Sequence, residues 1–211
     1  RRYGFFIRKK RDEYLVRNNG KSAVLFNLTL VQKRYGNTTG TQINTLKNIM
    51  AHELFHAILA DYVNNKWDLP LLDRLTSEIV GLMLNEGIAH YIADKHTITK
   101  YYHSDSTWYI REKAAFQKLA ENSKILFDPE SDLEERKEMA LKGTYWDKYI
   151  CIPAMFMAFH IEELRGIRVL KKCVREGPIY FIRVYNEMQR AHKQLPELPE
   201  ELTYLIRPGH S

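Results

Sequence analysis

The chain has 211 residues, of which 45% are hydrophobic and 27% charged, so it can bury one sizeable core and is not a disordered chain. Its net charge of +6 permits contact with nucleic acid, but the basic residues are spread along the sequence, and the one tight run, at residues 8–11, is followed at once by Asp12 and Glu13. We therefore expect no nucleic-acid partner.

Two further features narrow the class of protein. Cys151 and Cys173 both lie in apolar helical patterns, so we expect free buried thiols rather than a disulfide framework or a structural zinc site. The longest apolar run, at residues 149–161, is too short to span a bilayer, and no signal peptide is recognisable. These observations favour a cytoplasmic location.

The first 35 residues are predicted to form β-structure. Residues 3–8, 13–17 and 22–31 are rich in β-branched and aromatic residues, and Asn-Gly at positions 19–20, between two of these runs, is a strong hairpin signal. We predict a small antiparallel sheet of about three strands. The predicted fold class is α+β, mostly helical, with this N-terminal sheet packed on the helix that follows.

From Asn44 onward the apolar residues follow a helical period, and Gly, Pro and capping residues separate the periodic segments. The expected helices cover residues 44–64, 70–95, 107–120, 128–143, 149–164, 167–175 and 178–192. No linker or internal repeat is recognisable, so residues 1–211 are predicted to form one domain. Its predicted parts are a sheet portion (1–43), a helical portion (44–195) and an irregular tail (196–211).

The first predicted helix carries a His-Glu-x-x-His motif. His52 and His56 are one helical turn apart on the same face, as two ligands of a single Zn²⁺ require. Glu53 is displaced around the helix by about 100°, so it can reach the open coordination position without being a ligand and accept a proton from zinc-bound water. The motif would also arise by chance in on the order of 1% of chains of this length.

A third ligand is expected from the second long helix. Glu86 lies beside the apolar stripe of that helix, where a buried carboxylate is costly unless it is paired or bound to a metal. Gly87 follows it in mid-helix, where glycine costs about 1 kcal/mol relative to alanine, so close packing of another helix, or of the helix with the His-Glu-x-x-His motif, is expected there. We predict a zinc site of His52, His56 and Glu86 with one open position. An exposed Glu86 near a helix kink is the simpler alternative.

The two motifs together, HELFH and then NEGIAHY on the next long helix, resemble the gluzincin group of zinc peptidases. The resemblance is to the aminopeptidase branch and to a set of small bacterial gluzincin-like proteins, and it is specific over these two helices only. It implies a zincin-like fold and a zinc metallopeptidase with His52, His56 and Glu86 as ligands and Glu53 as general base. It also implies a peptide or protein substrate that pairs with an edge strand at residues 22–31.

The sequence departs from the gluzincin pattern at three points. The interval from His56 to Glu86 is longer than in the aminopeptidases. No Gly-Ala-Met-Glu-Asn segment precedes the motif, which puts recognition of a free N-terminus in doubt. His90 stands one turn after Glu86, where some gluzincins carry an aspartate that orients a zinc-bound histidine. His90 is therefore an alternative third ligand in place of Glu86.

Hydrolysis also needs a donor for the negative charge that develops on the reacting carbonyl oxygen. Gluzincins often supply a Tyr or His from a later segment, and the candidates here are Tyr145, Tyr149, His103 and His160. In the family pattern a tyrosine opens a long helix, which favours Tyr149, while simple packing is the alternative for both tyrosines.

The combined interpretation is a zinc-dependent peptidase in which Glu53 activates the attacking water. The alternative is a catalytically inactive zinc-binding domain with a regulatory or scaffold role. The chain is small for a peptidase, and no single donor for the carbonyl oxygen stands out.

Overall fold

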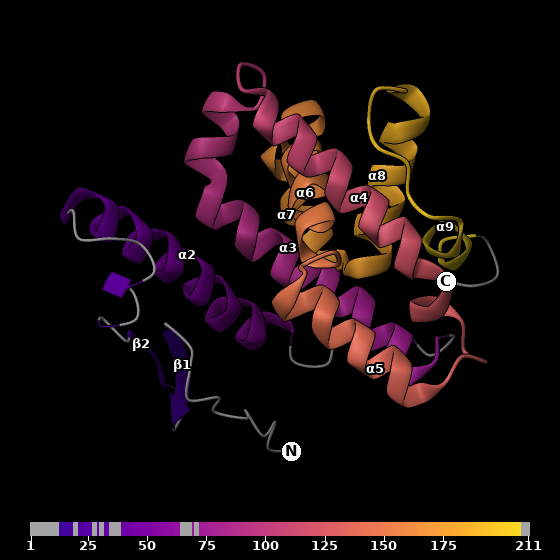
Figure 1. The fold of residues 1–211 in the computed structure, drawn as a ribbon, viewed down its shortest axis with the longest axis horizontal. Coiled ribbons are helices and arrows are strands. Elements are labelled where there is room, and N and C mark those ends of the chain that lie inside the picture. Colours follow the sequence, from indigo (N-terminus) through magenta and orange to yellow (C-terminus); the bar gives the residue numbers. More distant parts are fainter. Residues whose placement is uncertain are drawn as a thin grey trace.

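The computed structural model describes residues 13–18, 21–26, 29, 32–33, 39–63, 69 and 72–207. Most of these residues are helical, and α2 lies along one side of the other helices (Figure 1). The elements in chain order are β1 (Glu13–Asn18), β2 (Lys21–Phe26), α2 (Thr39–Val63), α3 (Arg74–Tyr101), α4 (Ser106–Phe127), α5 (Leu133–Leu141), the π-helical turn η1 (Lys142–Trp146), α6 (Cys151–Arg165), α7 (Ile167–Glu176), α8 (Pro178–Ala191) and α9 (Glu200–Leu205).

The predicted α+β class is wrong, although the predicted helical majority is confirmed. In the described part of the chain, strands occur only as the antiparallel hairpin of β1 and β2. The predicted strand at residues 22–31 ends at Phe26, because residues 29 and 32–33 are helical, and residues 3–8 lie outside the described residues. A short apolar run cannot be assigned to strand or helix by periodicity alone, and a single hairpin forms no sheet layer. The expected pairing of a substrate with this strand stays a prediction, limited to β2.

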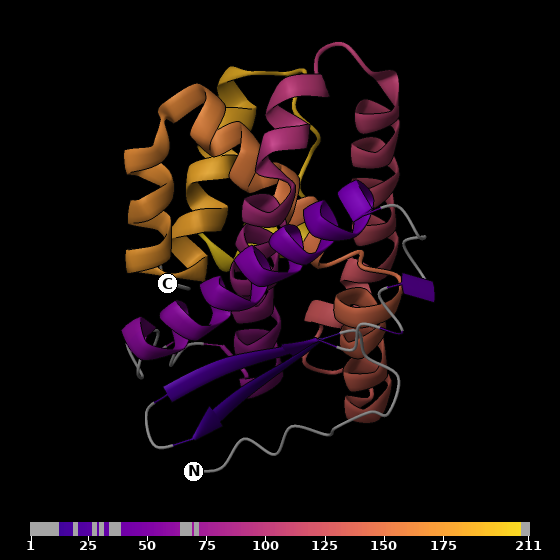
Figure 2. The same ribbon diagram turned by 90° about the vertical axis from the view of Figure 1, so that its left-hand side faces the viewer.

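The core is built around α6. Every residue of this helix from Cys151 to Ile161 is buried, as expected for a helix that is apolar on all sides. Helices α3, α4, α7 and α8 all contact α6, and both views show it enclosed by them (Figures 1 and 2). No helix among the described residues combines the length and apolar character needed to cross a membrane. The contact with α6 holds α3 against the centre of the protein.

Gly87 marks a very close approach of α3 to α6. A Cβ atom at this position would lie 2.4 Å from the Cβ of Ala154 and 2.8 Å from its carbonyl carbon. The close packing predicted from a mid-helix glycine is therefore confirmed, and the neighbouring element is α6. Glu86 precedes this contact directly, so its backbone position is fixed by the packing of the two helices.

Replacing Gly87 with alanine is expected to lower the free energy of unfolding by about 1–3 kcal/mol, because the new methyl group overlaps Ala154. Gly81 on the same helix is the matched control, since a Cβ there would meet nothing within 4 Å. Gly81→Ala should raise stability by up to about 1 kcal/mol through helix propensity. Urea unfolding followed by circular dichroism measures both, and an unchanged midpoint for Gly87→Ala would contradict the close contact.

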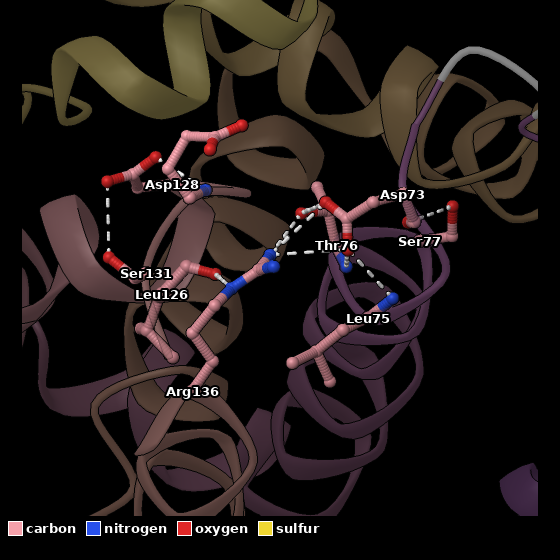
Figure 3. Close-up of polar contacts among 9 residues, drawn as sticks. Asp73, Leu75, Thr76, Ser77, Leu126, Asp128, Ser131 and Arg136 are labelled. Carbon is pink, nitrogen blue, oxygen red and sulfur yellow. Dashed lines mark hydrogen bonds and ion pairs between the residues drawn. The ribbon is translucent and has the colours of Figure 1, made fainter. Parts of the chain in front are cut away.

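A buried arginine anchors the start of α3. Asp73 caps this helix by accepting hydrogen bonds from backbone N–H groups of the first turn. Arg136 of α5, which is 2% exposed, donates to the Asp73 carboxylate, the Thr76 hydroxyl and the carbonyl of Leu126 (Figure 3). Burial raises the pKa of Asp73, but hydrogen bonds from Thr76 and Arg136 outweigh it and hold the pKa below its usual range. The helix therefore begins at Arg74, four residues after the predicted start.

Candidate metal centre

His52 and His56 lie one turn apart on α2 and direct their rings toward the same point. Their Nε2 atoms are 2.9 Å apart, and their ring centroids are 4.6 Å apart with the ring planes at 85°. Both side chains are half-buried. A continuous helix brings side chains four residues apart into this contact, so the structure joins the two histidines as their spacing predicts.

Glu86 reaches the same point from α3. Its Oε2 lies 3.4 Å from Nε2 of His52, and its Oε1 lies 3.6 Å from Nε2 of His56. The ligand atoms of these three residues all lie within 4.8 Å of one another, which is true of no other such group in the described ranges. Two consecutive helices, α2 and α3, therefore supply the whole group.

The three side chains fit a zinc ion. Ligands at about 2.0–2.2 Å from a tetrahedral Zn²⁺ lie about 3.3–3.6 Å from each other. The two nitrogen–oxygen distances of 3.4 and 3.6 Å, one to each oxygen of Glu86, agree with this range. The two Nε2 atoms are 2.9 Å apart and would separate slightly around a bound ion. Two imidazoles and one carboxylate are also a donor set found in catalytic zinc sites, where a fourth position remains for water or substrate. A carboxylate buried beside two imidazoles needs a nearby positive charge, which the metal would provide.

The protonation of Glu86 agrees with metal binding, whereas a metal would displace the proton that His56 holds more readily than a free imidazole. Burial raises the pKa of Glu86, but hydrogen bonds and charges from His52 and His56 outweigh burial and hold that pKa well below its usual range. Burial lowers the pKa of His56, whereas Glu86, Asn85 and Glu53 raise it, with a net result above its ordinary value. The carboxylate is thus ionised at neutral pH, as a zinc ligand must be.

Asn85 orients His56 from the side opposite the ligand group. Nδ1 of His56 lies 2.8 Å from Oδ1 of Asn85, so the ring donates its Nδ1–H and keeps the Nε2 lone pair for a metal. In the gluzincin pattern, the residue that orients a zinc-bound histidine stands at the position of His90. Asn85 is the sequence neighbour of Glu86. Its contact with His56 joins two helices, and no sequence pattern within either helix predicts it.

A family model covers nearly the whole chain. The family described as "Putative zinc dependent peptidase (DUF5700)" matches residues 6–194. The chain belongs to this family. No curated protein matches the chain, and no solved structure does. The family description and the His52–His56–Glu86 group agree on zinc as the cofactor.

In this member of the zinc-dependent peptidase family, His90 and Lys148 form one edge of the metal centre. The ring centroid of His90 lies 4.7 Å from that of His52, and Nε2 of His90 lies 3.2 Å from Nζ of Lys148. Burial, then the charges of Lys148 and His52, lower the pKa of His90 to about 3. The neutral imidazole therefore accepts a hydrogen bond from the Lys148 ammonium. The structure places His90 beside the ligand group of His52, His56 and Glu86, not within it.

Glu53, the predicted general base, lies between the two histidines in the sequence of α2 and is half-buried. It is not a member of the convergent ligand group, as expected from its rotation of about 100° from His52 around the helix. Its role as general base stays a prediction.

The tyrosines proposed as donors to the reacting carbonyl oxygen have other surroundings. Tyr149 is buried, and its hydroxyl donates to the carbonyl of Met139 at 2.6 Å. Burial and then the charge of Asp147 raise the pKa of Tyr149 to about 12. Tyr145 lies in η1 with 41% of its surface exposed. The Tyr149 hydroxyl proton is thus engaged by the backbone in this conformation.

The two histidines named as alternative donors are paired with carboxylates. His160 is buried, and its Nε2 lies 2.6 Å from Oε1 of Glu112. His103 is exposed, and its Nε2 lies 2.6 Å from Oε1 of Glu163. These pairs join α6 to α4 and to the turn that follows α3, so both histidines contribute to contacts between separate segments.

Proposed function

We propose that the chain hydrolyses peptide bonds as a gluzincin-type zinc peptidase. The observation that carries this proposal is the convergence of His52, His56 and Glu86 from consecutive helices, at distances that suit zinc. The description of the family supports zinc-dependent peptidase chemistry and a peptide substrate. The Asn85 contact supports it further, because zinc-binding histidines usually have such a partner on the second ring nitrogen.

The residues have distinct roles in the proposed reaction. His52, His56 and Glu86 would hold zinc through two Nε2 atoms and a carboxylate oxygen. Bound zinc would supply Lewis acidity, which polarises the scissile carbonyl and lowers the pKa of water. The Glu53 carboxylate would accept a proton from the attacking water and deliver it to the nitrogen of the leaving amine as the C–N bond breaks.

A catalytically inactive zinc-binding domain, with a regulatory or scaffold role, is the second candidate. It is favoured by the surroundings of the proposed donors, since Tyr149 donates to a backbone carbonyl and His103 and His160 pair with carboxylates. A role for Tyr149 as donor would require its hydroxyl to leave the carbonyl of Met139.

Hydrolysis of a mixed peptide library by the zinc-loaded protein, read by mass spectrometry of new termini, distinguishes the two candidates. We expect cleavage that stops when a chelator removes zinc and returns when zinc is added back, because the proposed reaction requires the metal. Circular dichroism of the metal-free protein would show whether the helices persist. Full zinc occupancy without cleavage across a range of pH would support the inactive domain instead.

A further inference from the structure

Lys148 has an unusual backbone conformation next to the metal centre. It is the only non-glycine residue with positive φ in the described part of the chain, with φ of 57°. It follows the π-helical turn η1 and precedes α6, and its carbonyl accepts a hydrogen bond from the backbone N–H of Ile152 at 2.9 Å. A left-handed conformation costs a non-glycine residue roughly 1 kcal/mol or more, and both such residues and π-helical turns occur often at functional sites.

The consequence of this conformation is the position of the Lys148 ammonium. The side chain is half-buried, and its Nζ lies 3.2 Å from Nε2 of His90, whose ring is 4.7 Å from the ring of His52. His90 therefore lies between the ammonium and His52, which is a member of the ligand group. The ammonium and His90 thus lie at the same edge of the candidate metal centre.

The hydrogen-bond partner of Lys148 is an imidazole and not a carboxylate. Lys142 in the same segment pairs with Glu138 at 2.8 Å, and Lys95 pairs with Glu162 at 2.5 Å. No carboxylate lies within 4.0 Å of the Lys148 ammonium among the residues that the structure describes. An ammonium can only donate, so Nε2 of His90, 3.2 Å away, accepts one of its three N–H groups and the other two are available to a ligand.

We propose that Lys148 stabilises the negative charge that develops on the scissile carbonyl oxygen, and that His90 positions it. This inference rests on the proposed peptidase function. It supplies the donor that the sequence analysis sought at Tyr149, whose hydroxyl is engaged by the carbonyl of Met139. A fixed cation in a half-buried site stabilises developing charge more strongly than a solvated one.

Lys148→Met is the variant that tests this role, because it removes the charge and retains most of the side-chain volume. We expect kcat to fall by about 10²–10³-fold, as when one donor to the reacting oxygen is removed, with little change in KM. Affinity for a phosphinate peptide, whose tetrahedral anionic group mimics the reacting centre, should fall by a similar factor in calorimetry. Zinc content should stay at the wild-type value, because Lys148 is not in the ligand group.

Two further variants serve as controls. Lys142→Met removes an exposed lysine of the same segment, which pairs with Glu138, and should leave both readouts unchanged. Lys148→Arg retains the charge, so its kcat and its affinity for the phosphinate peptide should both stay close to the wild-type values. Thermal unfolding by circular dichroism confirms that each variant is folded before it is compared.

Three outcomes would overturn the inference. Wild-type kcat and phosphinate affinity in Lys148→Met would remove Lys148 from the reaction and leave the peptidase function standing. A loss confined to peptides with a free C-terminal carboxylate, and absent for their amides, would make Lys148 a binder of that carboxylate instead. Zinc-loaded wild-type protein that neither cleaves peptides nor binds the phosphinate would refute the peptidase function and this role together.

Discussion

Glu53→Gln is expected to lower kcat for peptide hydrolysis by about 10²–10⁴-fold, the usual contribution of a general base. Glutamine has nearly the same shape as glutamate, but its amide cannot accept a proton from the attacking water. Glu53 lies on α2 between the two histidines and outside the convergent ligand group. Zinc content should therefore stay at the wild-type level, which separates a loss of proton transfer from a loss of metal.

Glu53→Gln needs a control that makes the same chemical change elsewhere. Glu78→Gln on α3 is suitable, because Glu78 is exposed and pairs with Arg74 on the helix surface. Two quantities are measured for each variant: the initial rate of hydrolysis of the best peptide from the library, and the zinc content by atomic emission. Hydrolysis by Glu53→Gln at the wild-type rate would show that another group takes the proton.

Glu86→Ala is expected to reduce zinc affinity by more than the roughly 10–100-fold typical of residues that only orient a ligand. The substitution removes the one anionic donor of the group, whose oxygens lie 3.4 and 3.6 Å from the two histidine nitrogens. Two imidazoles alone leave two coordination positions to water, so the metal should dissociate during dialysis. Peptide hydrolysis should disappear with the zinc.

Zinc content after dialysis against a metal-free buffer measures the effect of Glu86→Ala. Glu78→Ala is the matched control on the same helix and should retain zinc, since its carboxylate is exposed and remote from the ligand group. Retention of zinc by Glu86→Ala, together with its loss from His90→Ala, would make His90 the third protein ligand.

Helical periodicity predicted the positions of most helices, and the differences at their boundaries have physical causes. The predicted helix at residues 44–64 begins earlier, at Thr39, and the helix predicted to end at residue 95 continues to Tyr101. Such boundaries depend on capping contacts and burial more than on period. The tail predicted to be irregular contains α9, because Leu202 and Leu205 are buried against the core. Burial of so few residues has no periodic signal in the sequence.

The candidate site was predictable where its determinants are local. His52 and His56 are related by helical spacing, and Glu86 was recognisable beside an apolar stripe and before a mid-helix glycine. Asn85 and Lys148 were not predicted as partners, because they contact residues 29 and 58 positions away in the sequence. A lysine with positive φ also carries no composition signal, unlike a glycine in a turn.

The sequence by itself determined which helices carry the candidate zinc-binding side chains and which donor atoms they offer, because both follow from spacing within single helices. Only the tertiary structure decided the rest: that Gly87 packs against Ala154, that Asn85 orients His56, and that the Tyr149 hydroxyl bonds to the backbone. Each of these depends on how separate segments pack around α6. The same packing, with the strained backbone before α6, places the Lys148 ammonium beside His90 at the edge of the metal centre.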